Sequence, residues 1–210
     1  MAIYLDSAIV AEAEAASQWG WVAGVTTNPT LLAKSDAHPE LIFQTLTALF
    51  TGDIFYQLTT TDFDEMIAEG KKAAALIGPQ TVLKVPATLT GLQVVAHLSP
   101  TIPCSVTAIY HPSQAVIAQV AGAKYAIAYV NRATRLLGDG YQLVSEMRQL
   151  LEGTQTTLLA ASIKSPEEAV KTLLAGAHHL TLPFSILQQM TTHPLSDQTV
   201  TEFNQQGQGL

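Results

Sequence analysis

Charged residues are scarce in this chain of 210 residues, at 13% of the sequence, half of the ~25% that soluble domains usually carry. The sequence contains ten Lys and Arg and 17 Asp and Glu, which gives a net charge of −7, and no run of basic residues is longer than two. The chain therefore lacks the basic patch that nucleic-acid-binding proteins present to phosphates. Because 48% of the residues are hydrophobic, an intrinsically disordered chain is also excluded.

Segments that direct proteins out of the cytoplasm are also lacking. The first ten residues, MAIYLDSAIV, contain no basic residue and break their apolar run at Asp6, which is not the pattern of a secretory signal. No stretch of about 18 apolar residues is free of polar breaks, as a membrane span requires. We therefore predict a cytoplasmic protein with neither a membrane nor a nucleic acid as partner.

Cysteine and metal-ligand patterns are sparse. Cys104 is the only cysteine, so no disulfide can form within the chain. The six histidines include no HxH or HExxH spacing, so we predict no metal site. A chain with so little charge has much apolar surface to cover, and we expect part of it to be buried in a homo-oligomer.

Eight short, β-rich apolar runs alternate with longer segments of helical period. The runs cover residues 3–5, 22–26, 54–56, 81–85, 102–107, 125–130, 157–161 and 179–182. The helical segments between and after them cover residues 8–19, 37–50, 62–77, 91–98, 112–120, 141–152, 166–175, 184–191 and about 195–206. No linker interrupts the alternation.

This alternation is typical of an α/β fold in which eight parallel strands close into a (β/α)8 barrel, the TIM barrel. Continuous apolar runs are expected when both faces of each strand are buried. The alternative is an open doubly wound sheet, but 210 residues divided among eight units fit a compact barrel, and no GxGxxG or GxxxxGK[ST] fingerprint is present. We predict a single (β/α)8 barrel domain over residues 1–210 with an additional C-terminal helix.

Residues able to do chemistry stand at the ends of seven of the eight predicted strands. They are Asp6, Thr26, Asn28, Gln57, Lys84, Thr107, Tyr129, Arg132 and Ser162. Parallel strands of a barrel all end at the same rim, which is where such barrels hold their active sites. We therefore expect these side chains to converge on one mouth.

Lys84 is unusual because it lies inside the apolar run Thr81–Pro86, whereas the other lysines fit loops or helix faces. A charged amine is costly to bury, so this position favours the neutral form. A neutral amine is the nucleophile that attacks a carbonyl carbon. The structural alternative is a lysine at a strand edge whose ammonium group reaches solvent.

Asp6 and Tyr129 each have two interpretations. Asp6 is either a general acid/base or a group that orients the lysine, or else it caps the helix that follows its strand. Tyr129 is either a proton donor or a buried tyrosine with a satisfied hydroxyl group. Spacing alone leaves both pairs of alternatives open.

The other strand-end residues also have structural alternatives. Gln57 and Thr107 either hold a water molecule or cap loops. Arg132 and Ser162 either bind a phosphate, for which the arginine fork is suited, or lie exposed after their strands. Asn28, which precedes a proline, is alternatively part of a turn.

Four segments make the sequence recognisable when they are taken together. They are AGVTTNP (23–29), LKVPAT (83–88), AGAKYAIAYVNR (121–132) and LAASIK (159–164). Their order and spacing are jointly very specific. Over essentially its whole length the chain resembles the fructose-6-phosphate aldolase / small transaldolase family, whose members are class I enzymes that form a Schiff base.

The resemblance implies a role for each strand-end residue. It implies catalytic roles for Lys84, Asp6, Gln57, Thr107 and Tyr129, and substrate-binding roles for Asn28, Thr26, Arg132 and Ser162. By this resemblance Lys84 forms the Schiff base and Arg132 with Ser162 binds phosphate. It also implies an enzyme without metal or cofactor, acting on a sugar phosphate and a hydroxy-ketone donor, that assembles into pentamers paired into decamers.

Two residues favour one branch of this family. Its transaldolases tend to carry glutamate and phenylalanine at the positions of Gln57 and Tyr129. A phenol can protonate an intermediate, whereas phenylalanine cannot, so we predict a lyase that cleaves fructose 6-phosphate to dihydroxyacetone and glyceraldehyde 3-phosphate. The alternatives are a transaldolase, which passes the dihydroxyacetone unit to another sugar phosphate, and a non-catalytic sugar-phosphate-binding barrel.

Two further residues depart from the family pattern and are predicted to shape the substrate pocket. Ile127 precedes Tyr129 by two positions in the same strand, so the two side chains point the same way. Family members often have a small residue at the position of Ile127, which is bulkier. Ser105 lies two residues before Thr107 and adds polarity where an apolar residue is common. We expect these two residues to alter substrate preference.

Overall fold

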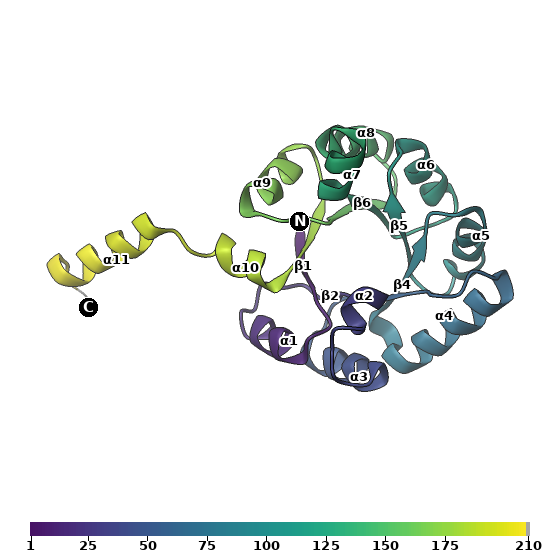
Figure 1. Ribbon diagram of the computed structural model, residues 1–210, viewed down its shortest axis with the longest axis horizontal. Coiled ribbons are helices and arrows are strands. Elements are labelled where there is room, and N and C mark those ends of the chain that lie inside the picture. Colours follow the sequence, from purple (N-terminus) through teal and green to yellow (C-terminus); the bar gives the residue numbers. More distant parts are fainter. Residues whose placement is uncertain (209–210) are drawn as a thin grey trace.

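Eight parallel strands close into a barrel in the computed structural model, which describes residues 1–208 (Figure 1). The strands are β1 (Ala2–Asp6), β2 (Val25–Thr26), β3 (Ile54–Gln57), β4 (Thr81–Pro86), β5 (Cys104–Ile109), β6 (Tyr125–Tyr129), β7 (Thr157–Ala161) and β8 (His179–Leu182). Each strand pairs with the next in the chain, and β8 pairs with β1. The predicted (β/α)8 barrel is therefore confirmed.

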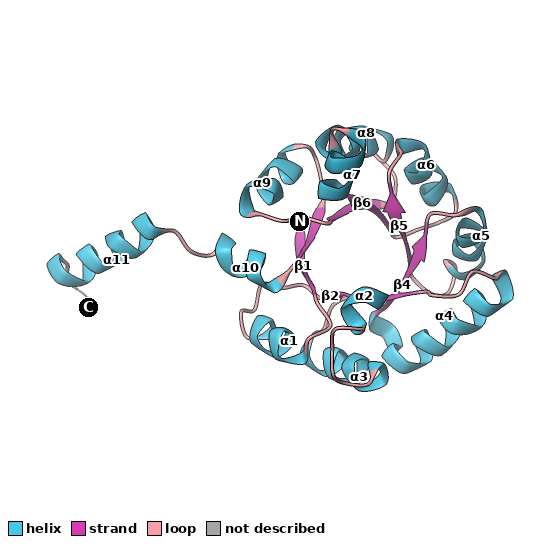
Figure 2. Cartoon of the chain, viewed as in Figure 1, coloured by secondary structure: helices cyan, strands magenta, loops and turns pink. Residues whose placement is uncertain are grey.

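Helices surround the barrel on its outside, as the cyan ribbons of Figure 2 show around the magenta strands, whereas the last helix extends away from it. They are α1 (Val10–Ser17), α2 (Pro29–Leu32), α3 (Pro39–Leu49), α4 (Phe63–Ile77), α5 (Leu89–Leu98), α6 (Pro112–Val120), α7 (Val130–Leu137), α8 (Gly140–Leu150), α9 (Pro166–Leu174), α10 (Phe184–Met190) and α11 (Pro194–Gln206), with a 3-10 turn η1 (Gly78–Gln80). Several of them begin with a proline, whose fixed φ and missing N–H suit the first helical position.

The interior of the barrel is a packed core. Side chains alternate along each strand between the helices and the interior. The interior cluster is formed by Tyr4, Phe55, Val82, Tyr125, Ile127 and Leu159, each at most 5% exposed. The rings of Tyr4 and Phe55 meet edge to face, with their centroids 5.5 Å apart. Because these side chains fill the barrel below its mouth, only the carboxyl ends of the strands leave room for a ligand.

The sequence did not predict α2 and α7. Asn28, for which a turn was one alternative, is the N-cap of α2 and accepts a hydrogen bond from the Leu31 N–H at 3.0 Å. The chain enters α7 directly after Tyr129, so β6 ends there and not at Val130. As a result Arg132 lies in the first turn of a helix, where its position is fixed by the helical backbone.

The second strand is shorter than the apolar run that predicted it, since only Val25–Thr26 pair regularly. At Gly24 the chain passes so close to Asp53 that a Cβ atom would lie 2.2 Å from the Asp53 carbonyl oxygen. Only a glycine permits this close approach. Regular pairing of β2 with β3 begins directly after Gly24, at Val25 and Ile54.

The last helix, α11, extends away from the barrel (Figure 1). None of its residues is buried, and Leu195, Val200 and Phe203 are all more than half exposed. Within residues 1–208 no helix combines the length and the apolar character needed to cross a membrane.

Candidate active site

A cavity of about 400 Å³ opens at the carboxyl ends of the strands. Seven of the predicted site residues line it, namely Asp6, Asn28, Gln57, Lys84, Tyr129, Arg132 and Ser162. They come from β1, β3, β4, β6 and the segments that follow β2, β6 and β7. These seven side chains therefore lie together at one mouth of the barrel, where the ends of the parallel strands were expected to bring them.

Lys84 lies in the middle of β4 and is only 3% exposed. Its strand neighbours in register are Gln57 on β3 and Ser105 on β5. The Nζ atom donates a hydrogen bond to the backbone carbonyl oxygen of Thr27 at 3.2 Å. Within residues 1–208 no carboxylate oxygen lies within 4.0 Å of Nζ. Lys84 thus combines a buried stem with an amine that faces the cavity, and it does not reach solvent from a strand edge.

Asp6 is held at the cavity wall by the Thr26 hydroxyl, which is itself paired with the Thr181 hydroxyl. The Thr26 Oγ1 atom donates to Asp6 Oδ1 at 2.8 Å and lies 2.6 Å from the Thr181 Oγ1 atom. The following helix, α1, has Ile9 as its N-cap, so Asp6 does not cap it. Thr26 is fully buried behind the carboxylate, and its contact with the cavity is through Asp6.

Tyr129 carries the one phenol in the cavity lining, and Thr107 stands behind it. The Thr107 hydroxyl donates to the Tyr129 hydroxyl at 3.3 Å. Immediately after Thr107 the backbone of Ala108 has φ +59°, and the pairing of β5 with β6 shifts register there. This bulge interrupts the pairing of β5 with β6 directly after Thr107, whose hydroxyl meets that of Tyr129.

Gln57 presents an unpartnered carbonyl oxygen. Its Oε1 atom is buried and has no hydrogen-bond partner among the described residues. The side chain lines the cavity next to Lys84. Because buried acceptors are nearly always paired, this oxygen is a ready partner for a donor on a ligand or on a water molecule.

The loop that follows Gln57 is fastened to α4 by a single carboxylate. Glu69 accepts hydrogen bonds from the backbone N–H groups of Thr59 and Thr60, and from the Tyr56 hydroxyl at 2.9 Å. Burial acts to raise the pKa of Glu69, but the hydrogen bonds from Thr59, Thr60 and Tyr56 together hold that pKa below its usual value. Burial and the bond to Glu69 raise the pKa of Tyr56. The end of β3 is therefore fixed on both sides of Gln57.

Arg132 lies over the ring of Tyr129. Its guanidinium carbon is 5.2 Å from the ring centroid, and its Nη1 atom donates to the Tyr110 hydroxyl at 3.5 Å. This stacking is a cation–π contact. The arginine and the phenol are thus held against each other at the cavity wall.

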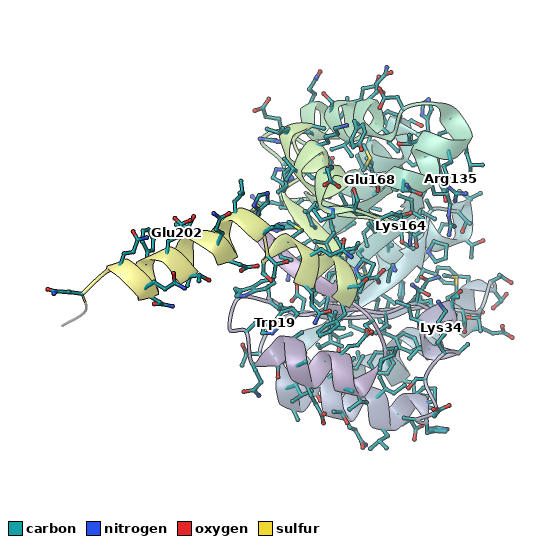
Figure 3. The ribbon with its side chains drawn as sticks, turned by 60° about the vertical axis from the view of Figure 1, so that its left-hand side comes forward. Trp19, Lys34, Arg135, Lys164, Glu168 and Glu202 are labelled. Atoms are coloured by element: carbon teal, nitrogen blue, oxygen red, sulfur yellow. The ribbon has the colours of Figure 1, made fainter. Side chains whose placement is uncertain are left out.

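Ser162 and Lys164 complete the side of the cavity next to Arg132. Ser162 has φ +60°, a left-handed conformation that costs free energy in a residue with a Cβ atom. No role was predicted for Lys164 from the sequence, although it follows Ser162 by two residues in the LAASIK segment. Figure 3 shows Lys164 on the same side of the barrel as Lys34 and Arg135. The cavity lining itself carries the basic side chains Lys84, Arg132 and Lys164, in a chain whose net charge is −7.

Ser105 and Ile127 lie below the cavity and do not line it. Each precedes a site residue by two positions, so it points the same way but one layer deeper in the barrel. The Ser105 hydroxyl donates to the Leu83 carbonyl oxygen at 3.2 Å. Ile127 is 1% exposed and packs in the interior cluster. Both residues therefore support the floor of the cavity from beneath.

The Cys104 thiol is fully buried and does not line the cavity. Burial raises the pKa of the Cys104 thiol to about 12, which disfavours the reactive thiolate. Within the described part of the chain, no group of three or more His, Cys, Asp or Glu side chains is arranged to hold a metal ion.

Comparison with known sequences gives a match over nearly the whole chain. A family model described as Transaldolase/Fructose-6-phosphate aldolase matches residues 3–209. A protein named "Probable transaldolase" from Alkaliphilus metalliredigens (strain QYMF) is 34% identical over all of this chain and 99% of its own length. A protein of the same name from Roseiflexus sp. (strain RS-1) is 39% identical over 97% of this chain and 95% of its own length.

Comparison with solved structures shows the same fold. A mandelate oxidase variant carrying an FMN adduct superposes with a TM-score of 0.63 over 87% of this chain, at 18% sequence identity. The chain spans 64% of the length of that structure. At this identity the likeness shows the barrel fold alone.

Proposed function

Because this chain belongs to the transaldolase/fructose-6-phosphate aldolase family, we propose that it performs aldol chemistry on a phosphorylated ketose through a Schiff base on Lys84. The observation that carries the proposal is the Lys84 amine, buried in β4 and facing a cavity lined by polar groups. A shielded amine attacks a ketone carbon, and the resulting protonated imine draws electrons from the neighbouring carbon–carbon bond. The non-catalytic alternative gives no reason for this burial.

Of the two reactions of the family, we propose the transfer of a dihydroxyacetone unit from a ketose phosphate to an aldose phosphate. The relatives from Alkaliphilus and Roseiflexus are named "Probable transaldolase", and these names favour the transferase, which was the alternative predicted from the sequence. The lyase that the sequence predicted first is the second candidate. The Tyr129 hydroxyl at the cavity wall favours it, because a phenol supplies a proton to the intermediate.

The proposed reaction begins at the C2 ketone of the substrate. The Lys84 nitrogen adds to this carbon, water leaves, and a protonated imine forms. Asp6 then takes the proton of the C4 hydroxyl, and the C3–C4 bond breaks. The electron pair of this bond passes into the imine, which becomes an enamine on Lys84. The aldose phosphate departs. The enamine then either attacks the aldehyde of an acceptor or is protonated. In the first case hydrolysis of the new imine releases a new ketose phosphate, which is transfer; in the second, hydrolysis releases dihydroxyacetone, which is cleavage.

Two groups of side chains support these steps. Gln57 and Tyr129 line the cavity next to the amine, where a water molecule and protons must move, and the Thr107 hydroxyl supports the Tyr129 hydroxyl from behind. Arg132 with Ser162 and Lys164 forms the cationic side of the cavity, which suits the phosphate group of the substrate. Asn28 at the N-cap of α2 faces the same cavity and is proposed to contact substrate hydroxyls.

We also propose that the chain forms a homo-oligomer, as the family resemblance implies. Helix α11 buries none of its residues in its own barrel, and its apolar side chains Leu195, Val200 and Phe203 are exposed. A second copy of the chain is the partner proposed for this helix. Sedimentation of the purified protein tests this, because a monomer at micromolar concentration contradicts it.

One experiment separates the proposed reactions. Release of glyceraldehyde 3-phosphate from fructose 6-phosphate is followed without acceptor and then with erythrose 4-phosphate. Release that depends on the acceptor indicates transfer, and equal release without it indicates cleavage. Borohydride with the ketose is expected to trap a covalent adduct on Lys84. The Lys84→Ala variant is expected to lose both turnover and trapping, whereas Lys71→Ala, at an exposed lysine, keeps both. Turnover in Lys84→Ala contradicts the covalent mechanism.

A further inference from the structure

Glu168 places a carboxylate beside the cationic side of the cavity. It lies in the first turn of α9, close to Lys164 (Figure 3). A negative charge at this place repels a phosphate group. A role for Glu168 at this place must therefore come from its contacts with other residues of the protein.

The two carboxylate oxygens of Glu168 bind two different elements of the cavity wall. Its Oε1 atom accepts a hydrogen bond from Asn131 Nδ2 at 2.7 Å. Its Oε2 atom accepts a hydrogen bond from the backbone N–H of Lys164 at 2.8 Å. Asn131 immediately precedes Arg132 in α7, and Lys164 lies in the loop after β7. Glu168 is thus a bridge between the two elements that carry the cavity cations.

The bridge is held in place from two further directions. The backbone N–H of Asn131 donates to the Ser162 carbonyl oxygen at 2.9 Å, so the same two elements also meet directly. The Ser165 hydroxyl accepts the N–H of Glu168 at 3.2 Å and caps α9. The carboxylate therefore stands on a fixed helix turn, and both of its bonds are charge-assisted.

We propose that Glu168 is a positioning residue for a phosphate monoester group in this cavity, because it sets the spacing between Arg132 on α7 and the Ser162–Lys164 loop. This inference rests on the proposed function of the cavity as a sugar-phosphate site. It assigns to Glu168 no contact with the substrate. Its effect on binding passes through the two elements that it joins.

Positioning and electrostatics predict opposite signs for the removal of this carboxylate. If Glu168 acted on a phosphate only through its charge, removing it would strengthen phosphate binding. If it acts by joining the two elements, removing it weakens binding, since Arg132 and the loop lose their common anchor. The sign of the change therefore separates the two roles.

Inorganic phosphate titrated calorimetrically into the full-length protein measures this sign directly. We expect Glu168→Ala to raise the dissociation constant for phosphate at least about tenfold, because a hydrogen bond to a charged group is worth about that factor or more. Glu168→Gln keeps one acceptor oxygen, so we expect a smaller loss. The matched control is Glu167→Ala, which removes the same charge from an exposed neighbour on the same turn and is expected to bind phosphate at least as tightly as the wild type.

Kinetics give a second readout that a general loss of structure would not reproduce. For Glu168→Ala we expect the KM for the phosphorylated ketose to rise by a similar factor while kcat stays the same. Borohydride trapping of unphosphorylated dihydroxyacetone on Lys84 is expected to be unchanged. Asn131→Ala cuts the same bridge without a change of charge, and we expect it to weaken phosphate binding as well.

The outcomes distinguish this inference from the proposed function. If the wild type traps the ketose on Lys84 and binds phosphate, but Glu168→Ala and Asn131→Ala bind phosphate equally well or more tightly, the positioning role is overturned and the proposed function stands. If the wild type does not bind phosphate, the phosphate site and the role of Glu168 are overturned together. Weaker binding in both variants, with Glu167→Ala unaffected, supports the inference.

Discussion

Tyr125 and Asp53 meet at the base of the barrel, where the Tyr125 hydroxyl donates to Asp53 Oδ2 at 2.7 Å. The same oxygen accepts from Lys124 Nζ at 2.7 Å, and the Tyr4 hydroxyl lies 3.1 Å from that of Tyr125. Burial, with the bonds to Tyr4 and Asp53, raises the pKa of Tyr125, so its hydroxyl remains protonated. This network closes the end of the barrel opposite the cavity.

We expect Tyr125→Phe to lower the free energy of unfolding by about 2 kcal/mol, because a partly buried carboxylate loses one of its donors. Unfolding in urea measures the change. Turnover is expected to stay the same, since the network does not reach the cavity. Tyr141→Phe is the control, because the Tyr141 hydroxyl makes no hydrogen bond within residues 1–208 and its loss is expected to leave the urea midpoint unchanged. Equal losses in the two variants would contradict this account.

His179 makes the stability of this base depend on pH. Its Nδ1 atom accepts the N–H of Ala2 at 3.0 Å. Burial first, then the positive charges of the N-terminus, His178 and Lys124, lower its pKa to about 4, against an opposing effect of Asp53. The ordinary value is 6.5, so between these values the unfolded chain binds a proton that the folded chain does not. The stability that the neutral ring contributes above pH 6.5 is therefore lost as pH falls towards 4.

Urea unfolding at several pH values between 7 and 4 tests this expectation. The midpoint of the wild type is expected to fall more steeply than that of His179→Asn, whose side-chain oxygen can accept a hydrogen bond but does not titrate. Parallel profiles for the two proteins would show that His179 is not the group responsible.

Ser162 allows backbone strain and side-chain chemistry to be separated. Its left-handed φ of +60° costs a residue with a Cβ atom about 1 kcal/mol, and glycine avoids this cost. We expect Ser162→Gly to raise the free energy of unfolding by up to about 1 kcal/mol, and Ser162→Ala to leave it unchanged. Both variants lose the hydroxyl, so both are expected to raise the KM for a phosphorylated substrate. A stability gain in Ser162→Ala, or an unchanged KM in either variant, would argue against this division.

Tyr129→Phe tests what the phenol contributes. The variant keeps the ring under Arg132 but loses the hydroxyl that pairs with Thr107. Acceptor-independent release of glyceraldehyde 3-phosphate is expected to fall about a hundredfold, the usual effect of removing a general acid. Transfer to erythrose 4-phosphate is expected to fall less, since the acceptor carbon replaces the proton at the enamine. Equal losses in both assays would mean that the hydroxyl does not distinguish the two reactions.

The pattern of residues along the chain was enough to predict the barrel and its repeating units. Strands buried on both faces require continuous apolar runs, so a run such as Thr157–Ala161 coincides with a strand end to end. The same pattern predicted that Lys84 lies inside a strand, because its neighbours on both sides belong to one apolar run. The short helix α7 was not predicted, because its first residue, Val130, is also the last residue of the apolar run that predicted β6.

The contacts between side chains, in contrast, follow from the folded barrel. The bond between Asp53 and Tyr125 joins residues 72 positions apart, and the bridge from Glu168 to Asn131 joins residues 37 apart. The folded barrel also placed Ile127 one layer below the cavity that its motif suggested it would line. Local patterns record burial and chain reversal, whereas these contacts depend on the register of the strands and on the closure of the barrel, which no single segment encodes.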